Sequence, residues 1–190
     1  MKHLLLASLI TSTIAFASEN NTSNTISVKQ EGIKYIKMLG GALKKELQTQ
    51  MMADTTGLKA LEFCTAKANA ITQEVNKKLP SYATVRRTAL KLRNNIHNKA
   101  DVLDEKIMQE YTLSLKAKTF KPTDIKIVEE GNVNRVYKPL ITMPVCLKCH
   151  GTDVTSELKK HIKTAYPKDK AMDFKVGTLR GVIVAEIEKH

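Results

Sequence analysis

Apolar residues in the N-terminal half of the chain recur at helical spacing. Over residues 28–52 they stand three and four positions apart, which is the period of one face of a long amphipathic helix. The same spacing over 55–78 predicts a second helix, which Pro80 stops. Cys64 lies three residues after Leu61 on the apolar face of this second helix. The pattern therefore predicts long N-terminal helices, with one cysteine on an inward face.

The pattern changes after Pro80 to short runs that favour strands. β-branched residues and a rough alternation over 82–90 predict a strand or an extended edge. The remaining predicted elements are, in chain order, a helix over 101–118 capped by Asp101, a hairpin of strands 125–128 and 133–141 around Glu130-Gly131-Asn132, a helix over 154–164 and a strand over 179–187. Helices first and strands late, without βαβ alternation, predict an α+β domain built on an antiparallel sheet.

The first 17 residues have the features of a secretory signal peptide. A basic start precedes an apolar run over 4–16, and the run ends in a small-x-small cleavage site. The run is shorter than the roughly 20 residues of a membrane span, and no later stretch is apolar for long enough to cross a bilayer. We therefore expect a signal peptide over 1–17, a flexible polar lead-in over 18–28 and a single domain over 29–190, in an exported, periplasmic protein.

The net charge of the chain limits the classes of partner that we expect. Of 190 residues, 31 are Lys or Arg and 19 are Asp or Glu, which gives a net charge of +12 and favours an anionic partner. Because an exported protein does not meet the genome, we expect an acidic partner protein or an anionic membrane surface, and no nucleic acid. The apolar fraction of 42% and the charged fraction of 26% exclude a fibrous or wholly disordered chain.

One motif carries recognisable chemistry: Cys146-Leu147-Lys148-Cys149-His150 matches C-x-x-C-H, the signature of c-type haem attachment. Two thiols add to the two vinyl groups of haem, and the adjacent imidazole can bind the iron from one side. The motif predicts one covalent haem c on Cys146 and Cys149, with His150 as an iron ligand. A zinc knuckle is one alternative, but no second C-x-x-C or paired histidine completes its four ligands. A disulfide oxidoreductase is another, because residues 143–145 provide an extended entry to Cys146.

The residues alone do not identify the ligand on the other face of the iron. Met143 stands too close to the attachment cysteines to reach that face, whereas His97, His161, Met172 and Cys64 remain candidates. The chain has three cysteines, so one thiol is left over after haem attachment. On an apolar helix face such a thiol is more often a small packing residue than a ligand.

Three stretches of the chain resemble a known family. They are residues 85–94, Val-Arg-Arg-Thr-Ala-Leu-Lys-Leu-Arg-Asn; the attachment motif followed by Gly151; and residues 166–181, which begin Tyr-Pro-Lys-Asp-Lys-Ala and end Leu-Arg-Gly. They are similar to the exported monohaem c-type proteins with a PAS-like domain, once catalogued as a domain of unknown function. The similarity spans about residues 55–187. It implies a PAS-like antiparallel sheet that carries one covalent haem c.

The resemblance also implies roles for particular residues. It places His150 on the proximal side of the haem and Cys64 on the distal side, and it implies that the arginine pair at 86–87 and Arg93 neutralise the haem propionates. Arg87 and Arg93 are thus the expected cofactor-binding arginines. His97 departs from the family pattern and is the main rival of Cys64.

These ligands lead to an expected function. A thiolate opposite His150 would stabilise ferric iron and give a reduction potential well below that of a His/Met cytochrome. With both axial positions filled, we expect no enzyme but an electron carrier of low potential or a redox sensor. The alternative is a haem-based sensor in which a diatomic gas displaces Cys64. A haem enzyme that reduces peroxide or nitrite would need an acid or base over an open distal site, and the sequence shows no such constellation.

Overall fold

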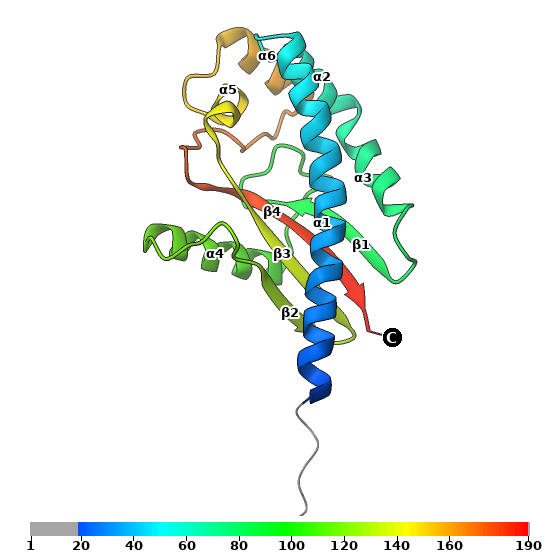
Figure 1. Cartoon of the computed structure of the whole chain (residues 1–190). Coiled ribbons are helices and arrows are strands. Elements are labelled where there is room, and N and C mark those ends of the chain that lie inside the picture. Colours follow the sequence, from blue (N-terminus) through cyan, green and yellow to red (C-terminus); the bar gives the residue numbers. More distant parts are fainter. Residues whose placement is uncertain (1–18, 190) are drawn as a thin grey trace, which may run out of the picture.

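The computed structural model describes residues 19–189, so the signal peptide expected over 1–17 lies outside the described residues. The α-helices are α1 (Glu19–Ala53), α2 (Leu58–Ala66), α3 (Ala68–Asn76), α4 (Val102–Lys116), α5 (Leu147–His150) and α6 (Ser156–Ala165). The other elements are the 3₁₀ turn η1 (Pro144–Cys146) and the strands β1 (Ala83–Thr88), β2 (Lys126–Glu130), β3 (Val133–Ile141) and β4 (Leu179–Glu188). Figure 1 shows α1 running along the sheet, with α2, α5 and α6 gathered at one end of the molecule.

The four strands form one antiparallel sheet in the order β1-β4-β3-β2. The C-terminal strand β4 pairs with both β1 and β3, and its apolar run over 182–185 is buried on both faces, as suits an inner strand. β2 and β3 form the predicted hairpin, whose turn includes Gly131 at a φ of +57°. The predicted α+β fold on an antiparallel sheet is confirmed.

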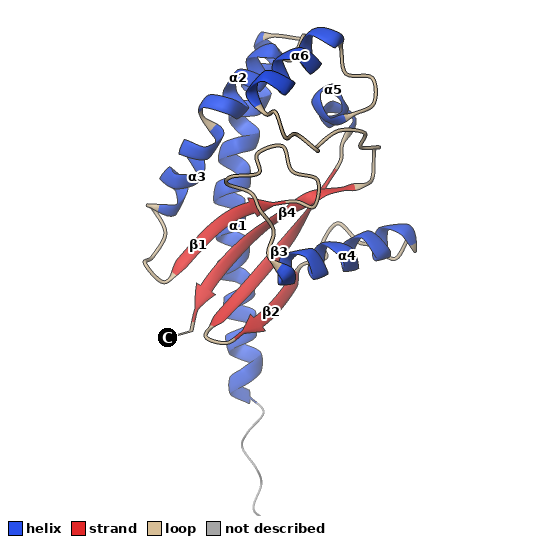
Figure 2. Cartoon of the chain, turned by 180° about the vertical axis from the view of Figure 1, so that it is seen from behind, coloured by secondary structure: helices blue, strands red, loops and turns tan. Residues whose placement is uncertain are grey.

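Side chains of β4 alternate between two cores, one on each face of the sheet. Ile183, Ala185 and Ile187 belong to the core under α1, and Val182 and Val184 belong to the core under α4. Figure 2 shows the two helices on opposite faces of the sheet, with α4 in front and α1 behind. The predicted stripe of α1 supplies the first core with Tyr35, Ile36, Leu39 and Leu43.

A close approach fixes α1 against β3. A Cβ atom placed on Gly32 would lie 2.4 Å from Cγ2 of Val136, which is far inside contact distance. Glycine therefore lets the helix backbone come directly onto the strand.

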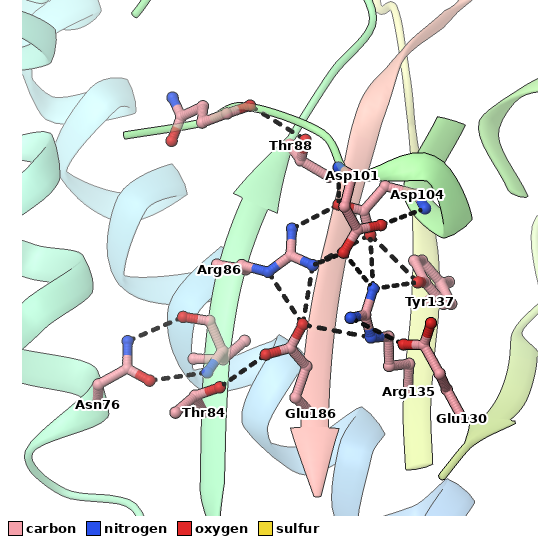
Figure 3. Close-up of polar contacts among 12 residues, drawn as sticks. Asn76, Thr84, Arg86, Thr88, Asp101, Asp104, Glu130, Arg135, Tyr137 and Glu186 are labelled. Atoms are coloured by element: carbon pink, nitrogen blue, oxygen red, sulfur yellow. Dashed lines mark hydrogen bonds and ion pairs between the residues drawn. The ribbon is translucent and has the colours of Figure 1, made fainter. Parts of the chain in front are cut away.

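Charged groups anchor α4 to the other face of the sheet (Figure 3). The carboxylate of Asp104 is fully buried, lies 2.7 Å from Arg86 and accepts a hydrogen bond of 3.1 Å from the hydroxyl of Tyr137. Glu186 on β4 lies 2.8 Å from Arg86 and 3.5 Å from Arg135. Because each buried charge has a partner of opposite sign, the network holds the helix to β1, β3 and β4 without an isolated charge.

Two predicted helix boundaries differ from the structure. Residues 19–28, expected within a flexible lead-in, are the first part of α1. The helix expected over 55–78 is interrupted at Lys67, where φ is −119°. Both pieces pack on α1, and in addition α2 packs against α6 and α3 against β1. The other predicted elements are present, including the helix capped by Asp101.

A third apolar cluster closes the end of the molecule where α2 meets α6. Its buried members are Leu61, Val154, Leu158 and Ile162. Cys149, Tyr166 and Met172 pack against them, so this cluster brings α2 to the attachment motif. Within residues 19–189, none of the helices combines the length and apolar character needed to span a membrane.

Candidate functional site

The C-x-x-C-H motif forms a continuous helical turn after β3. Met143 is extended, and the chain then enters η1 and α5 with helical torsion angles at Cys146. A separation of three residues in a helix places two side chains on the same side. Cys146 and Cys149 are therefore presented together, and His150 follows directly. The extended entry expected over 143–145 is limited to Met143, because η1 begins at the proline after it.

His150 is held by a backbone carbonyl and an aromatic ring. Its Nδ1 lies 2.7 Å from the carbonyl oxygen of Ala171, and because a carbonyl accepts only, Nδ1 carries the proton and Nε2 keeps a free lone pair. The ring of Phe174 packs edge-on, with 6.2 Å between the ring centroids. Burial, and then the charges of Arg180 and Arg93, lower the pKa of His150 to about 2. His150 is thus a neutral, oriented imidazole suited to bind a metal through Nε2.

Three arginines converge beside this motif. Arg87 and Arg93 are the two that sequence analysis singled out, and Arg180 at the start of β4 is a third. All three lie close enough to Cys64 for their charges to act on its thiol. The sequence did hold one signal for Arg180, because it is a lone cation at the start of a strand whose next residues are apolar.

The described part of the chain neutralises only one of these arginines with a carboxylate. Arg93 lies 3.2 Å from Asp169, and both side chains are almost fully buried, at 10% and 7% exposed. Burial lowers the pKa of Arg87, and burial together with the charge of Arg93 lowers that of Arg180 to about 10. The Nε atom of Arg87 is buried without a hydrogen-bond partner within residues 19–189. The site therefore holds more buried positive charge than its own side chains offset.

The neighbouring Arg86 does not belong to this cluster. Successive residues of a strand face opposite sides, and Ala83 and Val85 lie in the core under α1. Arg87 continues that face, whereas Arg86 points to the other face and pairs with Asp104. The two members of the arginine pair therefore lie on opposite faces of the sheet, and Arg86 is engaged by Asp104.

Cys64 lies in the last turn of α2, partly buried against the core under α1. Burial raises the pKa of its thiol, while the charges of Arg87, Arg93 and Arg180 act in the opposite direction. Its charge also influences Cys149, so the fold brings the third cysteine near the attachment motif.

The rivals of Cys64 for the second axial position are placed differently. His97 and His161 are exposed, the first in the loop between β1 and α4 and the second on α6. The sulfur of Met172 lies 3.3 Å from Nη2 of Arg93, on the segment that holds the motif histidine. Among these candidates, Cys64 is the one the structure places among the three arginines.

The geometry does not favour the two alternative uses of the motif, a zinc site and a disulfide oxidoreductase. Among the described residues, no group of three or more His, Cys, Asp or Glu side chains is placed to hold a metal ion, whereas a closed zinc site takes four. A disulfide oxidoreductase keeps its first cysteine at the N-terminus of a helix that stabilises the thiolate, whereas α5 after Cys146 is a single turn.

The chain belongs to the Tll0287-like family, whose model matches residues 6–187 and so includes both the sheet and the C-x-x-C-H turn. Among solved structures, the chain is similar to the cyanobacterial heme-protein Tll0287, with a TM-score of 0.58. The two share 20% sequence identity over 91% of this chain and 98% of that chain, so the likeness is one of fold. No curated protein sequence matches the chain.

Proposed function

We propose that this chain carries one covalently attached haem c and serves in electron transfer at low potential or in redox sensing. The observation that carries the proposal is the C-x-x-C-H turn beside His150, whose Nδ1 is fixed by the Ala171 carbonyl so that Nε2 can bind iron. The similarity to a heme-protein of the same family supports it.

The arginine cluster fits the anionic groups of such a cofactor. Haem has two propionate carboxylates, and Arg87 and Arg180 are two buried or partly buried cations without a carboxylate partner in the described residues. Charge-assisted hydrogen bonds from guanidinium to carboxylate are the strong kind. Arg87 and Arg180 are thus the propionate partners we propose. Arg93, expected from the resemblance to share this role, already binds Asp169.

Bound haem would supply a one-electron Fe(III)/Fe(II) couple, and the chain's own residues would set its properties. His150 would hold one axial position and Cys64 the other, with the arginines stabilising the thiolate form of Cys64. A thiolate donor favours ferric iron and a low potential. With two protein ligands in place, a substrate has no access to the metal, so we propose a carrier or sensor and no enzyme.

A second candidate function is ligand-gated sensing, in which a diatomic gas displaces Cys64. The observation that favours it is the place of Cys64, three residues before the helix break at Lys67, on a helix of nine residues. A side chain at the end of a short helix can move away without unfolding the sheet. The PAS-like character implied by the resemblance accords with this role.

The remaining parts of the proposal concern location and partner. We propose that the chain is exported to the periplasm by the segment 1–17, and that its net charge of +12 favours an acidic redox protein or an anionic membrane surface.

The decisive experiment is the mass of the exported protein made with haem-ligation machinery. We expect the mass of the polypeptide plus one haem, retained after denaturation because thioether bonds are covalent. The matched variants are Cys146→Ser with Cys149→Ser, which lose the covalent haem, and Cys64→Ser, which keeps it. Bare polypeptide in the unaltered protein would overturn the proposal.

A further inference from the structure

The segment that holds His150 is organised around Arg93. Nη2 of Arg93 lies 2.6 Å from the carbonyl oxygen of Cys149 and 3.2 Å from that of Ala171, besides its ion pair with Asp169. The guanidinium therefore joins the attachment turn to the segment around Ala171. Arg93 is thus a bridge within the protein.

A closed ring of contacts fixes this bridge. Asp169 accepts a hydrogen bond of 2.8 Å from the amide of Ala171 through Oδ1, and its Oδ2 lies 3.2 Å from Arg93. The carbonyl of Ala171 in turn accepts from Arg93. The amide of Lys170 donates to the carbonyl of Leu92 at 2.7 Å, which holds the residue before Arg93 against the same segment. Buried groups that each make two hydrogen bonds or ion pairs, as these do, are held rigidly.

The carbonyl oxygen of Ala171 consequently has two donors. Its two lone pairs accept Nδ1–H of His150 at 2.7 Å and Nη2 of Arg93 at 3.2 Å. A hydrogen bond from a cation draws electron density from the oxygen, so the oxygen pulls less strongly on the proton of His150. The strength of the hydrogen bond that Nδ1–H donates to this carbonyl governs how basic the imidazole is at Nε2.

We propose that Arg93 is a positioning residue that tunes His150 through the shared carbonyl of Ala171. Arg93 limits the basicity of the imidazole and keeps the carbonyl in line with Nδ1. This inference rests on the proposed function for its consequence at iron, but the hydrogen bonds themselves belong to the polypeptide.

Arg180 provides the matched control. It too is a partly buried cation whose charge acts on His150, but it donates to the carbonyl of Lys91 and lies over the ring of Phe174, 5.0 Å from its centroid. Replacing either arginine by glutamine removes one positive charge near the imidazole. Only Arg93→Gln removes a donor from the Ala171 carbonyl.

The test is the NMR resonance of the Nδ1 proton of His150 in protein labelled with ¹⁵N-histidine, in the diamagnetic ferrous state, together with the reduction potential. We expect Arg93→Gln to move this proton downfield and to lower the potential, and Arg180→Gln to lower the potential while moving the proton by much less. Arg93→Lys keeps the charge without the planar fork and should move the proton downfield by less. Circular dichroism identifies any variant that has not folded.

Two results separate failure of this inference from failure of the proposed function. If the proton stays in place in Arg93→Gln and Arg93→Lys, or moves equally in Arg180→Gln, Arg93 acts only as a charge and the inference is wrong. If the unaltered protein carries no haem, the same comparison on the metal-free chain still decides the role of Arg93, since the shared carbonyl is present there as well.

Discussion

At the scale of single residues, Cys64 decides what the proposed haem does. We expect Cys64→Ala to change the ferric absorption spectrum and to raise the reduction potential, because a thiolate donor is lost from iron. His97→Ala is the matched control, since His97 is exposed and its loss should leave both properties unchanged. Ferric and ferrous spectra, with and without carbon monoxide, together with redox titration give the answer.

The same spectra distinguish the two proposed functions. A ferrous protein that excludes carbon monoxide supports electron transfer, and one that binds it freely supports sensing by ligand displacement. An unchanged ferric spectrum in Cys64→Ala, with a changed one in His97→Ala, would show that the histidine is the ligand.

What the sequence could reveal at this scale depended on how local the chemistry is. Cys146, Cys149 and His150 are adjacent, so spacing alone marked them. Arg180 acts on His150 from the start of β4, and only the folded sheet brings the two together. Arg86 looked like its neighbour Arg87 until the faces of β1 were known.

At the scale of elements, the contact between α1 and β3 is sensitive to a single added methyl group. We expect Gly32→Ala to destabilise the fold by about 1–3 kcal/mol, because the new methyl would lie 2.4 Å from Val136 and force the helix off the strand. Gly41→Ala, on the same helix with nothing within 4 Å of its added Cβ, should stabilise the protein by about 0.5–1 kcal/mol. Urea unfolding of the two variants measures the difference.

A loss of stability in Gly41→Ala as large as in Gly32→Ala would contradict this explanation. The two changes would then act through the helix as a whole and not through the approach to β3.

The elements themselves were largely predictable where a local signal existed. Asp101 capped α4, and Gly131 marked the turn between β2 and β3. The interruption at Lys67 was missed because the apolar stripe continues through it and no proline or glycine stands there. Its cause is tertiary, since α2 and α3 share α1 but pack in addition on α6 and on β1 respectively.

At the scale of the whole molecule, two clusters of arginines differ in how far carboxylates neutralise them. The arginines beside the attachment motif have one carboxylate, Asp169, within their reach. The network under α4 pairs Arg86 and Arg135 with several carboxylates. The first arrangement leaves positive charge for an anionic ligand, whereas the second is complete within the fold.

The ion pairs beneath α4 make the free energy of unfolding depend on pH through Asp101. Partial burial acts to raise the pKa of Asp101, but hydrogen bonds from the Asp104 amide and from Arg135, with the charges of Arg135 and Arg86, lower it overall. A carboxylate whose folded pKa is below its unfolded value of about 3.9 stabilises the fold above that value. This contribution is lost as the pH falls through the folded pKa.

We therefore expect Asp101→Asn to be less stable than the unaltered protein at pH 7, and the difference to disappear as the pH falls through the lowered pKa of Asp101. The difference should not exceed about 1 kcal/mol, because the side chain of Asp101 is 46% exposed and solvent screens its ion pairs. Asparagine is also a good N-cap, so the variant removes the charge without removing the cap of α4. Asp153→Asn, an exposed aspartate without an ion pair within residues 19–189, is the control and should follow the unaltered protein at every pH. Thermal unfolding as a function of pH from 7 downwards measures all three, and a difference for Asp101→Asn that does not shrink as the pH falls would show that its contribution is not the charge pairing seen beneath α4.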